Sequence, residues 1–381
     1  MKYKLGAVVA AGVVLAGMLS PNAYADAGTQ QSGSVPPGQA KHAFVGPLFQ
    51  TTAIASTVPD NGDVNPYGVA VVPLTLNKLT QGNVLVSNFN NSGNSQGTGT
   101  TIVQVSPAGV VSLFAEIDPQ NLPGTCTGGV GLTTALVALR SGWVIVGSLP
   151  TTDGSAATAS AGCLLVLDST GTVRETIVGN GINGPWDMTA LDQGSRVDLF
   201  VTNVLNGTVA GNGAVVNGGT VLRVDLTIAP NAVPVVTGIT TIGSGFGQRS
   251  DPDALVVGPT GVGLAANGTL FVADSVGNRI AAINNAVRRH NSAGTGRTFS
   301  ADQNLSTPLG LAIAPNGDVL TVNAGDGNLV ETRPSGQVAV RTLDTSGSPP
   351  GAGALFGLAV NPSGRSVYYV DDATNTLNLL F

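Results

Sequence analysis

Two stretches of the chain carry the pattern that decides the fold: PLGLAIAPNGDVLTVNAGDGNLV at residues 308–330 and PTGVGLAANGTLFVADSVGNRI at residues 259–280. Each begins with Pro-x-Gly and an apolar run, passes through an Asn-Gly turn, and ends in a second apolar run. Asn-Gly between two apolar runs is a strong hairpin signal. A first run that is apolar at nearly every position suits a strand buried on both faces. Each stretch therefore predicts a hairpin whose first strand is deeply buried.

The same pattern recurs six times along the chain, and it is weakest in the second copy. The copies are NPYGVAVV (65–72), LTTALVAL (132–139), GPWDMTAL (184–191), GPTGVGLA (258–265), TPLGLAIA (307–314) and ALFGLAVN (354–361). Their starts lie about 47 to 75 residues apart, which leaves room for four strands and their loops. Four-stranded units repeated around an axis form a β-propeller. We therefore predict a six-bladed β-propeller of four-stranded blades, with a stacked solenoid as the alternative.

The two ends of the chain support a closed ring. After the start of the last copy only three strands fit, so one outer strand is missing. The segment PLFQTTAIAST at Pro47–Thr57 precedes the first copy and can supply that strand. Pairing the two ends would cover an otherwise open sheet edge. A solenoid would not need such a leading strand.

The composition supports an all-β protein and argues against a helix-rich fold and against a nucleic-acid-binding protein. Charged residues make up only 10% of the 381, whereas an ordinary soluble domain has roughly 25%. Glycine is abundant, with 53 residues, and the chain is rich in the β-branched and turn-forming residues that suit short strands. The formal net charge of −6 offers no basic surface for nucleic acid. We expect neither a helix-rich fold nor a nucleic-acid partner.

The first 25 residues have the features of a secretory signal peptide. Two early lysines precede an uncharged apolar run from Leu5 to Leu19, and an Ala-Tyr-Ala site ends at Ala25. The alternative is a membrane anchor, but about 15 apolar residues is short for a spanning helix of ~20. We expect an exported protein, periplasmic or extracellular, with no membrane span after cleavage. Residues 26–41 form a flexible leader, and residues 42–381 form the propeller.

The two quoted stretches resemble NHL repeats, and residues 44–381 resemble an exported six-bladed NHL propeller. Gluconolactonase-like metal hydrolases and streptogramin lyases share this superfamily. The resemblance implies a site at one mouth of the central channel, where the innermost strands begin. The six residues at that position are Tyr67, Thr134, Trp186, Thr260, Leu309 and Phe356. None is a carboxylate, an asparagine or a histidine, so the lyase histidine pair and the gluconolactonase-like glutamate have no counterpart here.

Aromatic residues at this mouth are the candidate binding groups. Tyr67, Trp186 and Phe356 could anchor a small molecule or a protein partner. The alternative is a packed and plugged channel entrance. Asp187 is the one acid beside the mouth, and a lone carboxylate does not by itself hold a catalytic divalent ion. Its alternative role is to cap a loop.

A second ring of polar residues lies at the ends of the second strands. Its members are Asn88, Ser148, Asn203, Asp274, Asn323 and Asp371. Their oxygens could bind Ca²⁺, which accepts carboxylate and amide ligands in a loose geometry. The alternative, favoured because these residues recur in nearly every blade, is that they cap their own turns. We therefore expect no cofactor, with Ca²⁺ as the alternative.

The two cysteines predict a disulfide. Cys126 precedes the second blade and Cys163 begins its third strand, which places both at one face of that blade. An even pair in an exported chain favours a bridge over two buried thiols. Two cysteines without a histidine partner do not suit a zinc site.

Together these features favour a non-catalytic, monomeric binding module that takes its ligand at the aromatic mouth. The alternative is a divergent gluconolactonase-like or lyase-type enzyme. Such an enzyme would use Asp187 and the Asn/Asp ring with a divalent metal.

Overall fold

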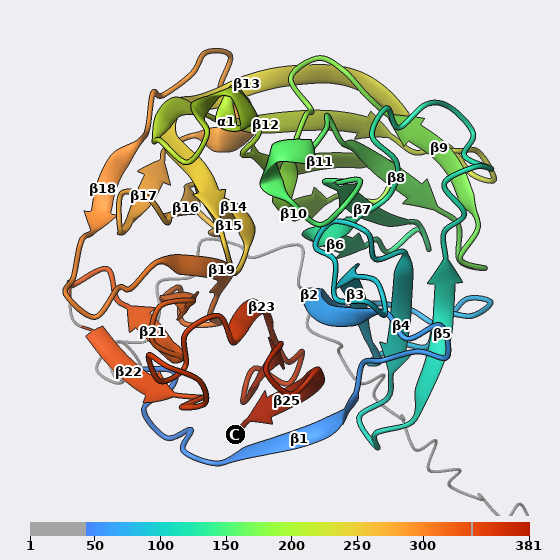
Figure 1. Ribbon diagram of the computed structural model, residues 1–381. Helices are drawn as coiled ribbons and strands as arrows, with labels where there is room; N and C mark the ends of the chain where they lie inside the picture. Colours follow the sequence, from blue (N-terminus) through green and yellow to red (C-terminus); the bar gives the residue numbers. More distant parts are fainter. Residues whose placement is uncertain (1–42, 337) are drawn as a thin grey trace, which may run out of the picture.

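Six antiparallel sheets surround a central axis in the computed structural model, which describes residues 43–336 and 338–381. Figure 1 looks along that axis and shows one strand of each sheet nearest to it. The chain is therefore the all-β six-bladed propeller that the repeats predict. The predicted signal peptide at 1–25 and leader at 26–41 lie outside the described residues. No helix within the described residues is long and apolar enough to cross a membrane.

Blades 1 to 3 follow the chain order from the innermost strand outward, except that the short last strand of blade 3 pairs with the end of the strand before it and lies in the central cluster. Blade 1 consists of β2 (Val64–Val71), β3 (Val84–Asn90), β4 (Thr101–Val105) and β5 (Val111–Glu116). Blade 2 consists of β6 (Leu132–Ala138), β7 (Val144–Ser148), β8 (Cys163–Leu167) and β9 (Val173–Ile177). Blade 3 consists of β10 (Pro185–Asp192), β11 (Arg196–Asn203), β12 (Val216–Thr227), β13 (Val235–Asp251) and β14 (Leu255–Val257).

Blades 4 and 5 repeat this order, and blade 6 borrows its outer strand from the start of the chain. Blade 4 consists of β15 (Pro259–Leu264), β16 (Leu270–Asp274), β17 (Arg279–Ile283) and β18 (Arg297–Ser300). Blade 5 consists of β19 (Pro308–Ile313), β20 (Val319–Asn323), β21 (Asn328–Thr332) and β22 (Val338–Thr342). Blade 6 consists of β23 (Leu355–Val360), β24 (Val367–Asp371), β25 (Thr376–Leu380) and β1 (Thr51–Ser56). Within the described ranges, short helices lie in three loops: η2 (Ala156–Thr158), α1 (Thr208–Gly211) and η3 (Ala286–Arg288).

The ring closes as predicted, because β1 pairs antiparallel with β25. Figure 1 shows β1 along the outer edge of blade 6. The chain just before β1 is held on blade 5 by two side chains. The buried carboxylate of Glu331 accepts the backbone N–H of Phe44 at 2.6 Å and that of Val45 at 2.7 Å. Arg341 donates to the Leu48 carbonyl at 2.6 Å.

Apolar faces of neighbouring sheets pack against one another and form the core. Between blades 1 and 2, for example, Leu85 and Phe114 share one cluster with Leu136 and Leu165, and all four are buried. The innermost strands approach closely where glycine stands. A Cβ on Gly357 would lie 2.0 Å from the Tyr67 carbonyl oxygen, so no side chain fits there.

Cys126 and Cys163 form the predicted disulfide, with 5.6 Å between their Cα atoms. The bridge ties the loop that enters blade 2 to the first residue of β8. Both residues belong to the buried cluster between blades 1 and 2.

Candidate ligand-binding site

The side chains predicted at the channel mouth stand where the innermost strands begin, which we call the start end of the channel. Tyr67, Trp186, Leu309 and Phe356 belong to one central apolar cluster. Tyr67 is 1% exposed, Trp186 2% and Phe356 0%. The three aromatic residues thus pack together instead of facing solvent, which is the arrangement of a plugged entrance.

Ring stacking organises this aromatic plug, by which we mean Tyr67, Phe89, Trp186 and Phe356. The Tyr67 ring stacks on Phe356 with centroids 4.1 Å apart and on Phe89 with centroids 4.5 Å apart. Trp186 lies tilted at 6.2 Å from Tyr67. Stacked aromatic pairs stabilise a core beyond their area burial. Phe89 was not predicted from the sequence, because it lies on β3 rather than at the start of an innermost strand and carries no repeat signal.

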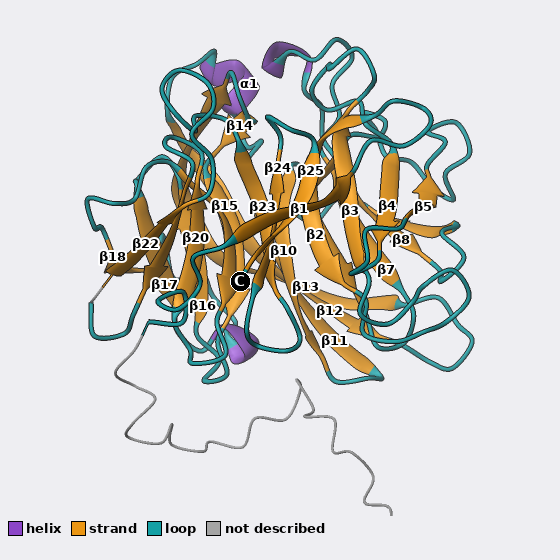
Figure 2. Cartoon of the chain, turned by 90° about the horizontal axis from the view of Figure 1, so that it is seen from below, coloured by secondary structure: helices purple, strands orange, loops and turns teal. Residues whose placement is uncertain are grey.

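A segment of blade 3 completes the plug. Residues 251–257 run from the end of β13 through β14 to the axis, and Leu255, Val256 and Val257 are buried in the same cluster. The indole N–H of Trp186 donates to the Val256 carbonyl at 3.0 Å. Figure 2 shows β14 at the same face of the ring as α1. A ligand could reach the aromatic residues from this face only after the segment moved.

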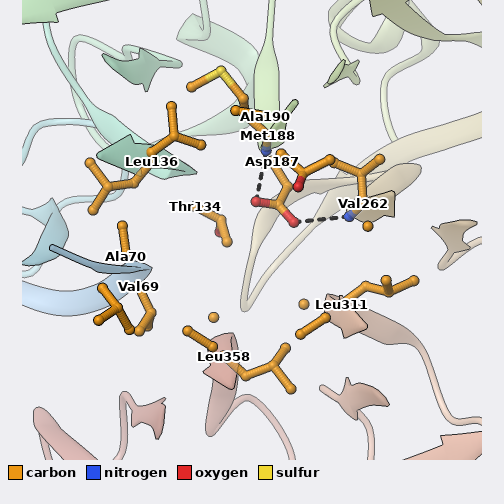
Figure 3. Close-up of a pocket in the computed structure, with 18 of the residues that line it drawn as sticks. Val69, Ala70, Thr134, Leu136, Asp187, Met188, Ala190, Val262, Leu311 and Leu358 are labelled. Atoms are coloured by element: carbon orange, nitrogen blue, oxygen red, sulfur yellow. Dashed lines mark hydrogen bonds between the residues drawn. The ribbon is translucent and has the colours of Figure 1, made fainter. Parts of the chain in front are cut away.

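The other half of the channel holds a cavity of about 420 Å³ that extends to the far ends of the innermost strands. All six blades contribute to its wall, and Figure 3 shows the arrangement. Its lining includes Val69, Leu136, Met188, Val262, Leu311 and Leu358. Each innermost strand has a partner on one side only, so its other edge presents backbone N–H and C=O groups toward the axis. The cavity therefore combines apolar side chains with polar backbone.

Asp187 is the buried acid of this cavity, at 7% exposure. Its Oδ1 accepts the N–H of Met188 at 2.8 Å, and its Oδ2 accepts the N–H of Val262, on the neighbouring blade, at 3.0 Å. Figure 3 shows the carboxylate between these two donors. Asp187 occupies the position that glycine takes in four other blades. Its own N–H donates to the Thr202 hydroxyl, which in turn donates to the Thr260 carbonyl at 2.7 Å and so bridges blades 3 and 4.

Burial raises the pKa of the Asp187 carboxyl to about 8, against the opposing effect of its two backbone hydrogen bonds. Removing a carboxylate from water disfavours its charged form, and two N–H donors offset only part of that penalty. Burial thus favours the neutral form of this carboxyl group at a pH where an exposed aspartate is ionised.

The two threonines of the predicted mouth differ in their surroundings. Thr134 lines the cavity, is 4% exposed, and has a buried hydroxyl oxygen without a hydrogen-bond partner. Thr260 is fully buried, and its hydroxyl bonds to Ser275 at 2.7 Å and to the Pro308 carbonyl at 3.1 Å. The structure thus brings Thr134 and Asp187 into one cavity and places the other predicted residues in the packing around it.

The second-strand ring contacts its own loops. Asn203 Oδ1 accepts the N–H of Asn183 at 3.1 Å, and Asp274 Oδ1 accepts the N–H of Gly277 at 3.0 Å. Asp274 also pairs with Arg279 at 2.8 Å. Across the part of the chain that the structure describes, no group of three or more His, Cys, Asp or Glu side chains is arranged to hold a metal ion.

No family model matches the chain, and no curated protein matches it. Three solved structures illustrate its structural neighbours. A gluconolactonase from Xanthomonas campestris is 12% identical with a TM-score of 0.51, and the match covers 85% of this chain and 88% of that one. A PQQ-bound aldose sugar dehydrogenase from Streptomyces coelicolor is 15% identical with a TM-score of 0.51, covering 87% and 98%. An inactive virginiamycin B lyase from Staphylococcus aureus, solved with quinupristin, is 15% identical with a TM-score of 0.49, covering 87% and 99%.

The gluconolactonase and the dehydrogenase share the propeller fold of this chain. The matched proteins include a lactonase and a dehydrogenase, so one propeller fold carries different chemistries. At these identities the likeness extends to the fold alone.

Proposed function

We propose that this protein is a non-catalytic binding module that holds a small molecule in the central channel. The observation that carries the proposal is the cavity of about 420 Å³, with Asp187 and Thr134 among the residues that line it. Ligand pockets typically measure ~300–1,000 Å³ and combine apolar walls with a few polar groups. This cavity has that size and that composition.

The chemistry of the lining supports binding over catalysis. Asp187 and Asp192 are the acids among the described residues that line the cavity, and no lysine, arginine or histidine lines it. Hydrolysis or elimination needs a second catalytic group, or an ion, positioned beside the first. Among the described residues that line the cavity, no second acid or base lies beside Asp187 to serve the competing proposal, a divergent lactonase-like or lyase-type enzyme.

We assign Tyr67, Trp186 and Phe356 a role in closing the channel rather than in contacting a partner directly. Their stacked rings and the 251–257 segment fill the start end. With that end filled, a ligand would enter at the opposite face, where the innermost strands end. Trp186 immediately precedes Asp187, so the plug also fixes the position of the acid.

Two further proposals concern export and oligomeric state. The signal-peptide features of residues 1–25 support the export. We propose cleavage after Ala25 and release of the mature protein as a monomer into the periplasm or the medium. Amino-terminal sequencing of the protein recovered from each fraction tests the cleavage. Sedimentation of that material tests the monomer.

Screening of small fragments against the mature protein, by crystal soaking and by ligand-observed NMR, tests the binding function. Ala190→Phe and Ala312→Phe each place a ring in the cavity, since both alanines are half-buried and line it. Ala232→Phe makes the same change at an exposed loop position and serves as the control. We expect fragments in the cavity of the wild type and of the control, and their loss in both blocked variants.

Two results would contradict the proposal. One is a screen in which no fragment occupies the cavity. The other is a set of fragments whose binding survives both blocking substitutions. Either result would leave the channel as a structural feature of the propeller.

A further inference from the structure

The lining of the cavity contains two polar side chains with unused hydrogen-bonding capacity. A carboxylate offers about four lone-pair positions, and the backbone N–H groups of Met188 and Val262 occupy two of those on Asp187. Thr134 has a buried hydroxyl with no partner at all. Leaving a buried hydroxyl unpaired is unfavourable, so an occupant that bonds to it would be stabilised. Figure 3 shows Thr134 and Asp187 facing the same space.

Both polar side chains can accept hydrogen bonds from a ligand. The Asp187 carboxylate accepts only, and the Thr134 hydroxyl can accept as well as donate. The strand edges around them present backbone carbonyls beside N–H groups. A ligand that bonds to Asp187 and Thr134 together must therefore carry several donors.

The charge of the cavity lining favours a cationic ligand. The described residues that line the cavity include two acids and no basic side chain. Asp192 lies 3.9 Å from Arg140, which partly balances its charge. The Asp187 carboxylate, in contrast, accepts its hydrogen bonds from backbone N–H groups, which carry no full charge. An anionic ligand would thus meet no compensating charge, whereas a cation would meet a carboxylate.

We propose that the cavity binds a small primary amine in its ammonium form, with the ammonium at Asp187 and Thr134. The three ammonium N–H groups match the acceptors just described, and the carbon chain contacts side chains such as Leu136 and Leu311. A divalent cation would need more carboxylate ligands than these blades supply. The inference rests on the proposed binding function and names its ligand class.

Binding of an ammonium ion should release a proton from the protein. Burial raises the pKa of the Asp187 carboxyl to about 8, which favours its protonated form at pH 7 before an amine binds. A neighbouring positive charge favours the carboxylate form. Binding of the amine at pH 7 should therefore release about one proton per site.

Calorimetric titration of the mature protein with n-hexylamine and with n-hexanol tests the proposal. The two probes have nearly the same size and differ in charge. Titrations at pH 7 in phosphate and in HEPES, whose ionisation enthalpies differ, give the number of protons released. We expect n-hexylamine to bind at least tenfold more tightly than n-hexanol and to release about one proton.

Three variants test whether Asp187 and Thr134 bind the ammonium group. Asp187→Asn should weaken n-hexylamine binding at least tenfold, abolish the proton release and change n-hexanol binding by less than twofold. Thr134→Val should weaken n-hexylamine binding severalfold, and it provides a second test if Asp187→Asn folds poorly. Asp198→Asn is the matched control, because Asp198 is also a buried aspartate of blade 3 but does not line the cavity. It should bind both probes like the wild type.

The outcomes separate this inference from the function on which it rests. Equal affinities for the two probes, or amine binding that Asp187→Asn and Thr134→Val leave unchanged, would overturn the amine assignment. The channel would remain a binding site if fragments still occupied it and the blocking substitutions still removed them. Absence of any fragment from the cavity would instead overturn the binding function itself.

Discussion

The indole N–H of Trp186 donates a hydrogen bond to the backbone carbonyl of Val256, 70 residues away in the sequence, at 3.0 Å. This bond joins the start of an innermost strand to a segment that returns from the outer edge of the same blade. It connects the aromatic plug to the chain that covers it. The closed end of the channel therefore depends on a contact made within blade 3.

Trp186→Ala should lower the free energy of unfolding by about 3–5 kcal/mol, because it removes a large, fully buried side chain from a packed cluster. Trp186→Phe should cost less, about 1–3 kcal/mol, since a ring remains and the main loss is the partner of a buried carbonyl. Urea unfolding monitored by circular dichroism measures both. Val110→Ala is the control, because Val110 is 67% exposed and its truncation should change stability by less than about 0.5 kcal/mol. A Trp186→Ala protein as stable as this control would contradict the packing described.

Much of the fold could be predicted from the repeats, because the signals that define their strands and turns act over only a few neighbouring residues. Asn267-Gly268 and Asn316-Gly317 are turn signals that act over a few residues, and the apolar runs on either side fix the strands. Counting strands at the two ends then predicted the pairing of β1 with β25. The long β12–β13 hairpin and β14 could not be predicted in this way, because residues 204–257 do not follow the repeat.

Removal of the closing strand should destabilise the ring. A chain that begins at Val58 lacks β1 and the contacts of Phe44 and Val45 with Glu331. It would expose the edge of β25, and unpaired strand edges promote association between chains. We expect a lower melting temperature and aggregation in light scattering. A chain that begins at residue 42 keeps all these contacts and should melt like the mature protein. Equal melting of the two shortened chains would show that closure contributes nothing.

The disulfide should account for a measurable part of the stability. Cys126 and Cys163 are 37 residues apart, and cross-linking a loop of that size stabilises by roughly 4 kcal/mol in the chain-entropy model. Reduction, or the double change Cys126→Ser and Cys163→Ser, should lower the free energy of unfolding by a comparable amount. Thiol titration of the denatured, unreduced protein should find no free cysteine. Two reactive thiols in protein recovered from an oxidising compartment would contradict the bridge.

The candidate site was less predictable than the fold, because its position depends on long-range packing. Asp187 stood out in the sequence as an acid in a glycine position, and it does line the cavity. Tyr67 and Phe356 were singled out by the same alignment, yet the sequence left open whether they bind or plug. Their burial depends on Val256 and its neighbours, which come from outside the repeat pattern. A repeat identifies equivalent positions and does not show which of them another segment will cover.

Metal removal should leave the molecule unchanged. Asn203 and Asp274 are engaged with backbone groups of their own loops, so an ion would have to compete with those bonds. An ion that bound only the folded state would raise the melting temperature. Since we expect no bound ion, the melting temperature should stay within about 1 °C when EDTA or millimolar Ca²⁺ is added. A clear rise with Ca²⁺ that Asn203→Ala or Asp274→Ala removes would establish the calcium alternative.

Asp187 should make stability depend on pH in a defined direction. Its pKa is about 8 in the folded protein, as against about 3.9 for an aspartate in an unfolded chain. Between these values the folded state holds a proton that the unfolded state has lost, so this group lowers stability as the pH rises. The loss of folding free energy caused by Asp187 is at most about 1.4 kcal/mol per pH unit, and it levels off above pH 8. The substitution Asp187→Asn should remove this pH dependence.

Comparison of pH slopes isolates this effect from the cost of the substitution itself. Asp318 and Asp372, whose pKa values burial raises to about 7, titrate equally in the wild type and in the Asp187→Asn variant. The stability difference between the two proteins should therefore shift steadily in favour of the variant from pH 5 to pH 7.5. Urea unfolding at half-unit steps of pH measures it. A difference that stays constant across this range would mean that Asp187 is ionised in the folded protein, and that its two backbone hydrogen bonds outweigh its burial.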